Sequence, residues 1–401
     1  MPFCLPLSRR TGAKAMLASI ATILGVKAAA ARITIPPTCR NAGSTCAEDD
    51  DCCSGRCIAK RDGRSRCART TSNRGNRDTR GNGNDRRPSP VPTATGVPGW
   101  HEVATIGSLG SGADQFDSPR GIALSPDELE LYVVDTVNDR ISVWTRPDTT
   151  SSWAANQTLG NGAGSALNQF ETPLGISMAD NGLDCYVADS DNNRVVRWSR
   201  SSLASQWAAT ETIGQGQGSG PAQLWLPGAV VVSENRQQLF IAELQNARIS
   251  QWATNGTDPW AHVTNVGSSG SAPDQFSMPL GVTLSVDMLE LYIADTGNNR
   301  VSIWTRATTG DPLSASTTLT GFSSPKGLVL SSDGLTLYVT DSGANRVVAW
   351  ARATTSGTWA PSATIASLGL NGPYGIALSA NDRTLYVSDM FNNRVVVYRY
   401  S

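Results

Sequence analysis

Residues 276–304, FSMPLGVTLSVDMLELYIADTGNNRVSIW, decide the fold because the chain repeats this pattern six times. Each copy opens on an apolar residue and closes on an aromatic residue, and the consensus between them contains Pro-x-Gly, Leu-Tyr-Val-x-Asp and Asn-x-Arg-Val. The copies occupy residues 116–144, 170–198, 224–252, 276–304, 322–350 and 370–398. A repeat this regular indicates that each unit buries its apolar face against neighbouring copies of itself.

Each copy is expected to form three short strands, which in the fourth copy are residues 280–284, 289–294 and 300–304. β-branched and aromatic residues fill these segments, and Gly, Asn and Asp lie between them, as is typical of strands joined by tight turns. The linking segments, such as residues 207–214 and 260–267, predict a fourth strand. No window has a helical period of apolar residues. Four antiparallel strands per repeat indicate a β-propeller blade.

The two ends of the repeat region are expected to meet. The chain stops at Ser401, directly after the third strand of the sixth copy, while residues 100–107 match the fourth-strand pattern and precede the first copy. An N-terminal strand that completes the last blade would close the ring and remove its exposed edges. The predicted fold class is all-β: a six-bladed β-propeller closed by the N-terminal strand and preceded by a small disulfide-rich module.

The repeat also resembles a known family. The start Pro-x-Gly-Ile-Ala-Leu, as at residues 373–378, and the finish Leu-Tyr-Val-x-Asp-x-x-Asn-x-Arg-Val, as at residues 385–395, resemble NHL repeats. The resemblance covers residues 100–401 and implies a six-bladed propeller. It implies no single activity, because NHL-type propellers bind proteins, RNA or glycans, and some related six-bladed propellers are lyases or lactonases.

Residues 1–31 have the pattern of an export signal. Arg9, Arg10 and Lys14 form a basic front, residues 16–26 are mostly apolar, and residues 28–31 are alanines that suit a signal peptidase. An anchored or ordinary N-terminus is the alternative. The apolar run is short for a membrane span, so we expect a secreted or cell-envelope protein with no integral span in the mature chain.

Six cysteines are crowded into the predicted module at residues 32–67: Cys39, Cys46, Cys52, Cys53, Cys57 and Cys67. So short a segment cannot build a large core, which favours disulfides, and six cysteines allow 15 pairings. A zinc site is the alternative, but residues 1–99 contain no histidine. The spacing resembles a knottin, and that resemblance implies the pairs Cys39–Cys53, Cys46–Cys57 and Cys52–Cys67. Cys185, alone in the second copy, is expected to be a buried filler.

Charge divides the chain into two unequal parts. Residues 1–99 hold 17 Lys and Arg against 7 Asp and Glu, whereas residues 100–401 hold 16 against 27. An acidic propeller is a poor candidate for nucleic-acid binding, which depends on neutralising phosphates. Residues 68–99 are rich in Arg, Gly, Asn, Ser and Pro and are expected to be a disordered basic linker. This linker is a spacer or a contact to an anionic surface.

Each repeat carries an acid and, five residues later, an arginine. The pairs are Asp135/Arg140, Asp189/Arg194, Glu243/Arg248, Asp295/Arg300, Asp341/Arg346 and Asp389/Arg394. Equal numbers in every repeat favour a structural charge ring over a catalytic site, which needs a few asymmetrically placed groups. The chain's two histidines, His101 and His262, fall on predicted outer strands, so a histidine-ligated metal or a histidine-dependent triad in the channel is not expected.

Departures from the repeat suggest a contact surface on the face that carries the long linking loops. Trp225, Leu244, Met390 and Phe391 are apolar residues that depart from the repeat consensus, and we expect them on that face. The alternative is that they lie beneath neighbouring loops.

These features predict an exported, monomeric binding or scaffold protein that recognises a protein or a glycan through the long-loop face. No catalytic residue, metal or cofactor is expected. The alternative is a metal-assisted lyase or lactonase of the six-bladed propeller type. A channel lined by Asp, Glu and Asn around one cation would favour that alternative.

Overall fold

A computed structural model describes residues 57–59, 65–67, 99–365 and 369–401, in two units, Met1–Thr95 and Gly96–Ser401. In the first unit β1 (Cys57–Ala59) pairs antiparallel with β2 (Ser65–Cys67), and Cys57 lies opposite Cys67. The export signal, the linker and the cysteine side chains of the predicted knottin-like module lie outside the described residues. Those predictions therefore stay predictions.

The second unit consists of six four-stranded antiparallel sheets, each a propeller blade. The innermost strands are β4 (Pro119–Leu124), β8 (Pro173–Met178), β12 (Pro227–Val232), β16 (Pro279–Leu284), β20 (Pro325–Leu330) and β24 (Pro373–Leu378). The second strands are β5 (Glu130–Asp135), β9 (Asp184–Asp189), β13 (Gln238–Glu243), β17 (Glu290–Asp295), β21 (Thr336–Asp341) and β25 (Thr384–Asp389). The third strands are β6 (Arg140–Thr145), β10 (Arg194–Ser199), β14 (Arg248–Ala253), β18 (Arg300–Thr305), β22 (Arg346–Ala351) and β26 (Arg394–Tyr400). The outer strands are β7 (Ala154–Leu159), β11 (Ala208–Ile213), β15 (Ala261–Val266), β19 (Ser314–Leu319), β23 (Ala360–Ile365) and β3 (Trp100–Ile106).

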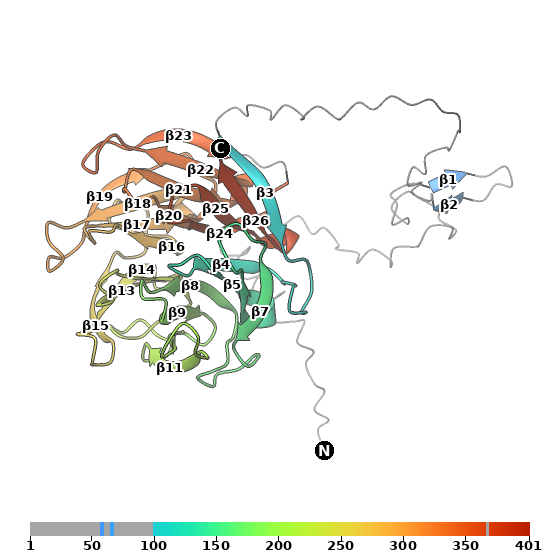
Figure 1. Cartoon of the computed structure of the whole chain (residues 1–401). Helices are drawn as coiled ribbons and strands as arrows, with labels where there is room; N and C mark the ends of the chain where they lie inside the picture. The colour runs from blue at the N-terminus through green and yellow to red at the C-terminus, as the bar shows by residue number, and fades with distance from the viewer. Residues whose placement is uncertain (1–56, 60–64, 68–98, 366–368) are drawn as a thin grey trace, which may run out of the picture. The chain divides into compact units, whose positions relative to one another are not determined.

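Blades are numbered here from 1 (β4 to β7) to 6 (β24 to β26 with β3). Figure 1 shows the inner strands gathered at the centre of the propeller and the outer strands at its rim. The predicted six-bladed all-β propeller is confirmed. Short 3-10 turns, η2 (Thr136–Asn138), η3 (Thr296–Asn298), η4 (Ser342–Ala344) and η5 (Met390–Asn392), join second to third strands. In the ranges that the structure describes, no helix is long and apolar enough to cross a membrane.

The last blade is closed by the N-terminal strand, as the sequence predicts. β3 pairs antiparallel with β26, with Ile106 opposite Val395, and the backbones of Gly99 and Ser401 bond to each other beyond the strand ends. Every sheet therefore has the same four-stranded form, and the ring has no open blade edge at the point where the chain enters and leaves it.

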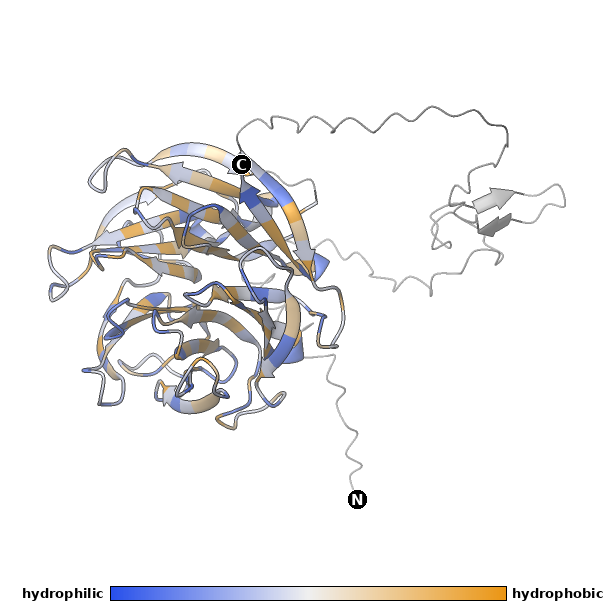
Figure 2. Cartoon of the chain, viewed as in Figure 1, coloured by the Kyte–Doolittle hydropathy of each residue, from blue (hydrophilic) through white to orange (hydrophobic). Residues whose placement is uncertain are grey.

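Alternating strand residues build the core of each blade and the contacts between blades. The hydropathy colouring in Figure 2 shows hydrophobic and hydrophilic residues alternating along many of the strands. The aromatic residue that opens a copy packs on the tryptophan that ends it, as for Phe116 and Trp144, whose ring centroids are 5.6 Å apart. Between blades, Tyr132 meets Trp207 edge to face at 5.9 Å, and four other tyrosine–tryptophan pairs repeat this contact. Such pairs add to the stability that area burial provides.

The residue just before the third strand links one blade to the next in five of the six blades. Asp139, Asn193, Asn299, Asn345 and Asn393 adopt a left-handed conformation, and the side-chain oxygen of each accepts a backbone N–H bond of 2.7–3.0 Å from the following blade. Asn and Asp tolerate this conformation better than other residues. In blade 3 the equivalent residue is Ala247, with φ +48°, which has no side-chain acceptor.

Candidate functional site

The structure brings each acid of the predicted charge ring together with its arginine. The six Nε–carboxylate distances are 2.7–2.9 Å, and every acid is fully buried. Asp295 also accepts bonds from the backbone N–H of Ser277 and from the Asn298 amide, at 2.7 and 2.8 Å. The oxygens of these acids are thus already hydrogen-bonded within the blade. Burial raises the pKa of Asp135, Asp189 and Asp295 and outweighs the hydrogen bonds that lower it.

The same arginines hold the long loops. Arg300 donates to the backbone carbonyls of Ser271, Ala272 and Gln275 at 2.6–2.9 Å. Equivalent bonds fix the loops over residues 107–118, 160–172 and 214–226. In blades 5 and 6 the loops over residues 320–324 and 366–372 are short, and Arg346 and Arg394 each donate to one described carbonyl.

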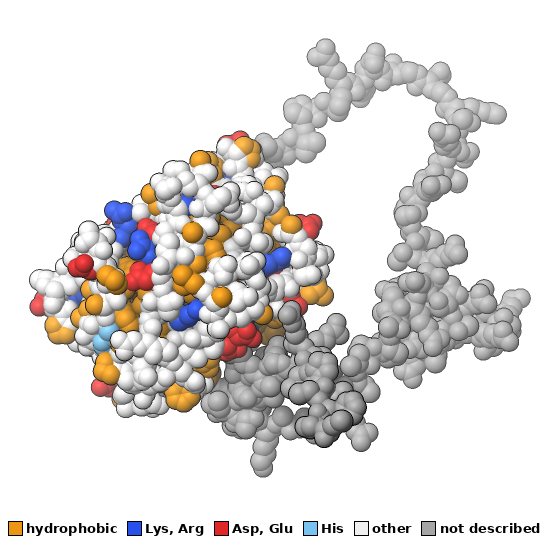
Figure 3. All heavy atoms as spheres, turned by 90° about the horizontal axis from the view of Figure 1, so that it is seen from below, with side chains coloured by type: hydrophobic (Ala, Val, Ile, Leu, Met, Phe, Trp, Pro, Cys, Tyr) orange, Lys and Arg blue, Asp and Glu red, His pale blue; other side chains and the backbone are white. Residues whose placement is uncertain are grey.

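The four predicted contact residues do not form one exposed patch. Trp225 in blade 3 and Phe391 in blade 6 are 38% and 54% exposed. Leu244 is partly buried, and Met390, only 4% exposed, packs in one cluster with Leu280 and Tyr374. Figure 3 shows one face of the propeller, on which hydrophobic side chains are scattered among polar ones and acidic and basic groups lie close together.

One position carries a different residue in almost every blade: the second residue of each inner strand. These channel-mouth residues are Arg120, Leu174, Gly228, Leu280, Lys326 and Tyr374. Leu280 of blade 4 clusters with Tyr374 of blade 6, and blades that are not neighbours in the ring can meet in this way only across its axis. Leu174, Leu280 and Gly228 form an apolar side, and blades 5, 6 and 1 supply two cations and a tyrosine.

Arg120 and Lys326 lie on the ring of Tyr374 from the two neighbouring blades. The guanidinium carbon of Arg120 is 5.3 Å from the ring centroid and the Lys326 amine is 4.8 Å from it. A cation over an aromatic ring is attracted by its quadrupole. Among the described residues, no carboxylate pairs with either cation, and the buried Nε of Arg120 has no hydrogen-bond partner. Two unpaired cations and an unsatisfied donor are the features of an anion-binding site.

The electrostatics of this cluster follow from burial and like charge. Burial lowers the pKa of Lys326 to about 8, and the neighbouring Arg120 contributes to the lowering. Burial raises the pKa of Tyr374, so its hydroxyl stays protonated near neutral pH, although Arg120 partly offsets this effect. A lysine with so low a pKa is partly an uncharged amine at pH 7 to 8 and can act as a base or nucleophile.

Two buried hydroxyls hold the backbone of this cluster in place. Thr340 accepts a bond from the Gly327 N–H and donates to the Tyr374 carbonyl, both at 2.7 Å. Ser388 accepts from the Gly375 N–H at 2.7 Å and donates to the Arg120 carbonyl at 2.6 Å. The equivalent residues of the other blades are Val134, Ala188, Ala242 and Ala294. Only blades 5 and 6, which carry Lys326 and Tyr374, therefore have this hydroxyl, and the Ser388 hydroxyl also holds the Arg120 carbonyl of blade 1.

Sequence reasoning missed Arg120, Lys326 and Tyr374 because they look like ordinary variation within the repeat. The available signal was the residue directly after Pro in each copy, which changes from blade to blade while most of its neighbours repeat. His101 and His262 lie on outer strands β3 and β15, and Cys185 is fully buried on β9. No group of three His, Cys, Asp or Glu side chains within the described ranges could hold a metal ion.

Comparison with known proteins gives a family model and several solved structures. The model of a lactonase with a seven-bladed β-propeller matches residues 226–401, less than half of the chain. A periplasmic gluconolactonase of Pseudomonas aeruginosa is 17% identical with a TM-score of 0.54, over 74% of this chain and 91% of that one. A Bacteroides uniformis protein assigned as a 6-phosphogluconolactonase is 16% identical with a TM-score of 0.54 over the same shares. No curated protein sequence matches.

These solved structures support the fold alone. The propeller domain of Cps50 (Swd1) from Myceliophteria thermophila, which is not described as a lactonase, has a TM-score of 0.51 at 10% identity, over 76% of this chain and 100% of that one. The family model is a lactonase and not an NHL repeat, so the NHL resemblance is not supported beyond the six-bladed propeller. The expected role as a binding scaffold for a protein or glycan is corrected by the same match, which favours the lactonase alternative.

Proposed function

We propose that the propeller hydrolyses a sugar lactone at the mouth of its central channel. The observation that carries the proposal is the cluster of Arg120, Lys326 and Tyr374, in which two cations without a carboxylate partner face one site. The lactonase family model supports it, because its match over residues 226–401 contains Lys326 and Tyr374. The names of the propellers from P. aeruginosa and B. uniformis suggest gluconolactone-type substrates.

The chemistry requires a base and a group that stabilises an oxyanion. The uncharged amine of Lys326 takes a proton from water, the water oxygen adds to the lactone carbonyl carbon, and negative charge develops on the carbonyl oxygen. Arg120 stabilises that charge through its positive guanidinium and its Nε–H, which has no other hydrogen-bond partner. The bond between the carbonyl carbon and the ring oxygen then breaks, and the ring oxygen receives a proton from the Lys326 ammonium. The product is a hydroxy acid.

The cations of the protein itself supply the positive charge in this scheme. The metal-assisted route named as the alternative in the sequence analysis would need a set of carboxylate or imidazole ligands at the channel. Tyr374 contributes a flat wall whose hydroxyl stays protonated, and Leu280, which packs in one cluster with Tyr374, makes part of the site apolar. A water-poor site strengthens the interaction of Arg120 with the developing charge.

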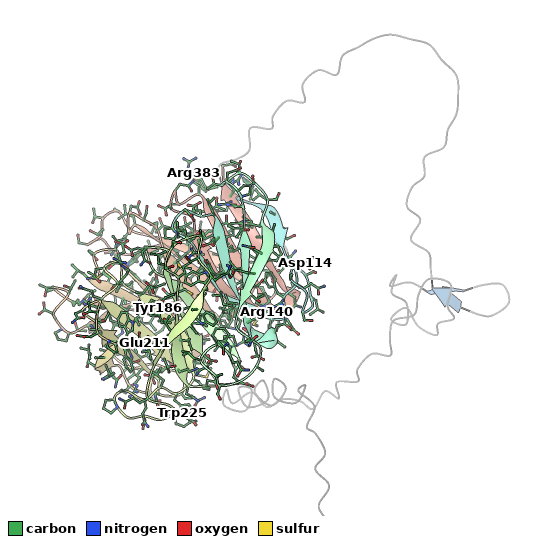
Figure 4. All side chains as sticks on the ribbon, turned by 60° about the horizontal axis from the view of Figure 1, so that its bottom comes forward. Asp114, Arg140, Tyr186, Glu211, Trp225 and Arg383 are labelled. Atoms are coloured by element: carbon green, nitrogen blue, oxygen red, sulfur yellow. The ribbon has the colours of Figure 1, made fainter. Side chains whose placement is uncertain are left out.

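The test is hydrolysis of glucono-δ-lactone and 6-phosphoglucono-δ-lactone by the full chain, followed as acid release above the spontaneous rate. We expect Lys326→Met and Arg120→Met each to lower kcat/KM by about 100-fold. Arg383→Met is the matched control, since Arg383 is an exposed arginine at the opposite edge of the propeller from Trp225 in the view of Figure 4. The wild-type rate should rise as the pH passes through about 8, because the Lys326 amine loses its proton there.

Three results would contradict the proposal. The first is no acceleration of either lactone above the spontaneous rate by the wild-type chain. The second is an activity that Lys326→Met and Arg120→Met leave at the level of Arg383→Met. The third is hydrolysis that depends on added Ca²⁺ or Zn²⁺ and is abolished by a chelator.

We also propose that the protein works outside the cytoplasm, in a periplasmic or extracellular setting. The signal-like residues 1–31 and the cysteine-rich residues 32–67 support this location, as does the periplasmic source of one similar propeller. N-terminal sequencing of the mature protein should find a start near residue 32. Alkylation without reduction should leave the six cysteines of the module unmodified, and their modification would contradict the disulfides.

A further inference from the structure

Lys326 is the only lysine between residues 99 and 401, a stretch that contains 15 arginines. Arginine supplies every ion pair that the structure records in the propeller. Lys326 is thus the one side-chain amine of the described propeller, and it lies at the channel mouth on strand β20. An amine and a guanidinium differ in one respect that matters here, because an amine can lose its proton near neutral pH and become a nucleophile.

The surroundings of the amine favour that nucleophilic form. Lys326 is partly exposed, and none of the described carboxylates pairs with it. Arg120 approaches the same Tyr374 ring, so the ammonium form is disfavoured by a like charge and by lost hydration. A desolvated lysine beside another cation is the usual arrangement of a reactive amine. The Nε–H of Arg120 has no hydrogen-bond partner and can donate to an anion next to the amine.

We propose that Lys326 captures small aldehydes or ketones that carry a phosphate or carboxylate group, as a reversible imine. Arg120 binds the anionic group and the Lys326 nitrogen adds to the carbonyl carbon. The resulting carbinolamine loses its hydroxyl as water, with one proton supplied by the solvent, and a carbon–nitrogen double bond forms. The nitrogen gives up its remaining hydrogens in these steps, no oxidant or reductant is needed, and added water reverses the reaction.

This inference uses the site described above but does not depend on lactone hydrolysis. An amine that adds to an aldehyde gives an imine that water cleaves, whereas an amine that adds to a lactone gives a stable amide. Capture of a carbonyl compound is therefore a separate, reversible activity of the same residue. Aldehyde trapping without lactone hydrolysis would support this inference and contradict the proposed hydrolase. Lactone hydrolysis without aldehyde trapping would support the hydrolase and contradict this inference.

The experiment treats the full chain at pH 7 with pyridoxal 5′-phosphate, reduces the imine with borohydride and maps the modified peptides by mass spectrometry. The variant Arg383→Lys provides an internal reference, because it places an ordinary exposed amine on the same propeller. We expect Lys326 to be modified about tenfold faster than that reference amine, because a larger share of it is unprotonated. The difference should shrink as the pH approaches 10.

The role of Arg120 is tested with pyridoxal, which has the aldehyde but lacks the phosphate. The preference for Lys326 should fall several-fold with pyridoxal, and Arg120→Gln should remove the advantage of the phosphate compound. Since the comparison of the two aldehydes needs no variant, it holds even if Arg120→Gln fails to fold. Modification of Lys326 at or below the rate of the reference amine would overturn the proposal. Equal modification by both aldehydes would overturn the part assigned to Arg120.

Discussion

At the scale of single residues, the propeller differs from a regular ring in a few side chains that break the repeat. The positions that repeat are hydrogen-bonded inside the blades, as the acid–arginine pairs are. The channel-mouth position does not repeat, and it places Arg120, Lys326 and Tyr374 together. A sixfold ring can support chemistry only where its symmetry is broken, because a reaction needs different groups in different places.

Asp139 gives a residue-scale prediction about pH. It occupies a turn position that is Asn in four other blades, and its carboxylate accepts the Thr172 N–H bond at 2.8 Å. Burial raises the pKa of Asp139 to about 6, and the charges of Glu171, Asp189 and Asp191 add to the effect. Since this folded-state pKa lies above the unfolded value, the group favours folding below about pH 4, and that contribution is lost as the pH rises through 6.

Asp139→Asn should therefore stabilise the protein at pH 7 by about 1–2 kcal/mol, allowing for solvent screening, and change little at pH 4. The amide oxygen can still accept the Thr172 bond. Urea unfolding at both pH values measures the difference. An equal effect at the two pH values would show that the charge of Asp139 is not the cause.

Ala247 gives a second residue-scale prediction, at the junction between blades 3 and 4. Its φ of +48° is costly for alanine, and the other five blades have Asn or Asp there, each bonded to the next blade. Ala247→Asn should stabilise by about 1 kcal/mol through relief of strain and an added bond to Met278. Thermal unfolding measures this, with Ala247→Gly as the control for relief of strain alone. A destabilised Asn variant would mean that this buried turn has no room for the amide.

At the scale of elements, the charge ring and the loops act together. Arg300 bridges Asp295 and three carbonyls of its long loop, and its side chain is 11% exposed. Arg346 bridges Asp341 and one carbonyl, and its side chain is 36% exposed. We therefore propose that the charge ring is structural. Each arginine contributes more to the stability of the fold when it bonds more carbonyls of its loop.

Arg300→Ala should lower the free energy of unfolding by about 3–5 kcal/mol, because it leaves the buried Asp295 without its cation. Arg346→Ala should cost less, since its guanidinium makes fewer bonds and is more open to water. Chemical unfolding of the two variants side by side is the measurement. The proposal is contradicted if Arg346→Ala lowers the free energy of unfolding more than Arg300→Ala does, or if Arg300→Ala unfolds like the wild-type protein.

Sequence reasoning at the element scale was accurate for the strands and incomplete for the site. Alternation and turn residues predict which segments form strands, because strand and turn preferences are local. These local preferences do not reveal which channel-mouth residues contact one another. Arg120 and Tyr374 are far apart in the chain and meet only when the ring closes. Leu244 and Met390 were expected on the loop-bearing face, but their packing toward Leu280 depends on the same closure.

At the scale of the whole molecule, the ring is closed by β3, the first strand of the propeller. Deleting residues 99–106 should expose the edge of β26, lower the unfolding temperature and cause association through the free edge. Light scattering and thermal unfolding measure both effects. Deleting residues 1–95 is the matched control, since the unit Gly96–Ser401 stays whole. A monomeric protein of unchanged stability after deletion of 99–106 would contradict the role of β3.

The sequence by itself determined the all-β class, the six blades and the closure by the first strand. Those features follow from periodicity and from the need of each repeat to bury its apolar face. The tertiary structure decided where chemistry can occur, because blades 5, 6 and 1 bring Lys326, Tyr374 and Arg120 around one axis and bury them partly without a counter-charge. The pKa of Lys326 and the unsatisfied donor of Arg120 arise from this shared burial, and burial is a property of the closed ring, which no single stretch of sequence has.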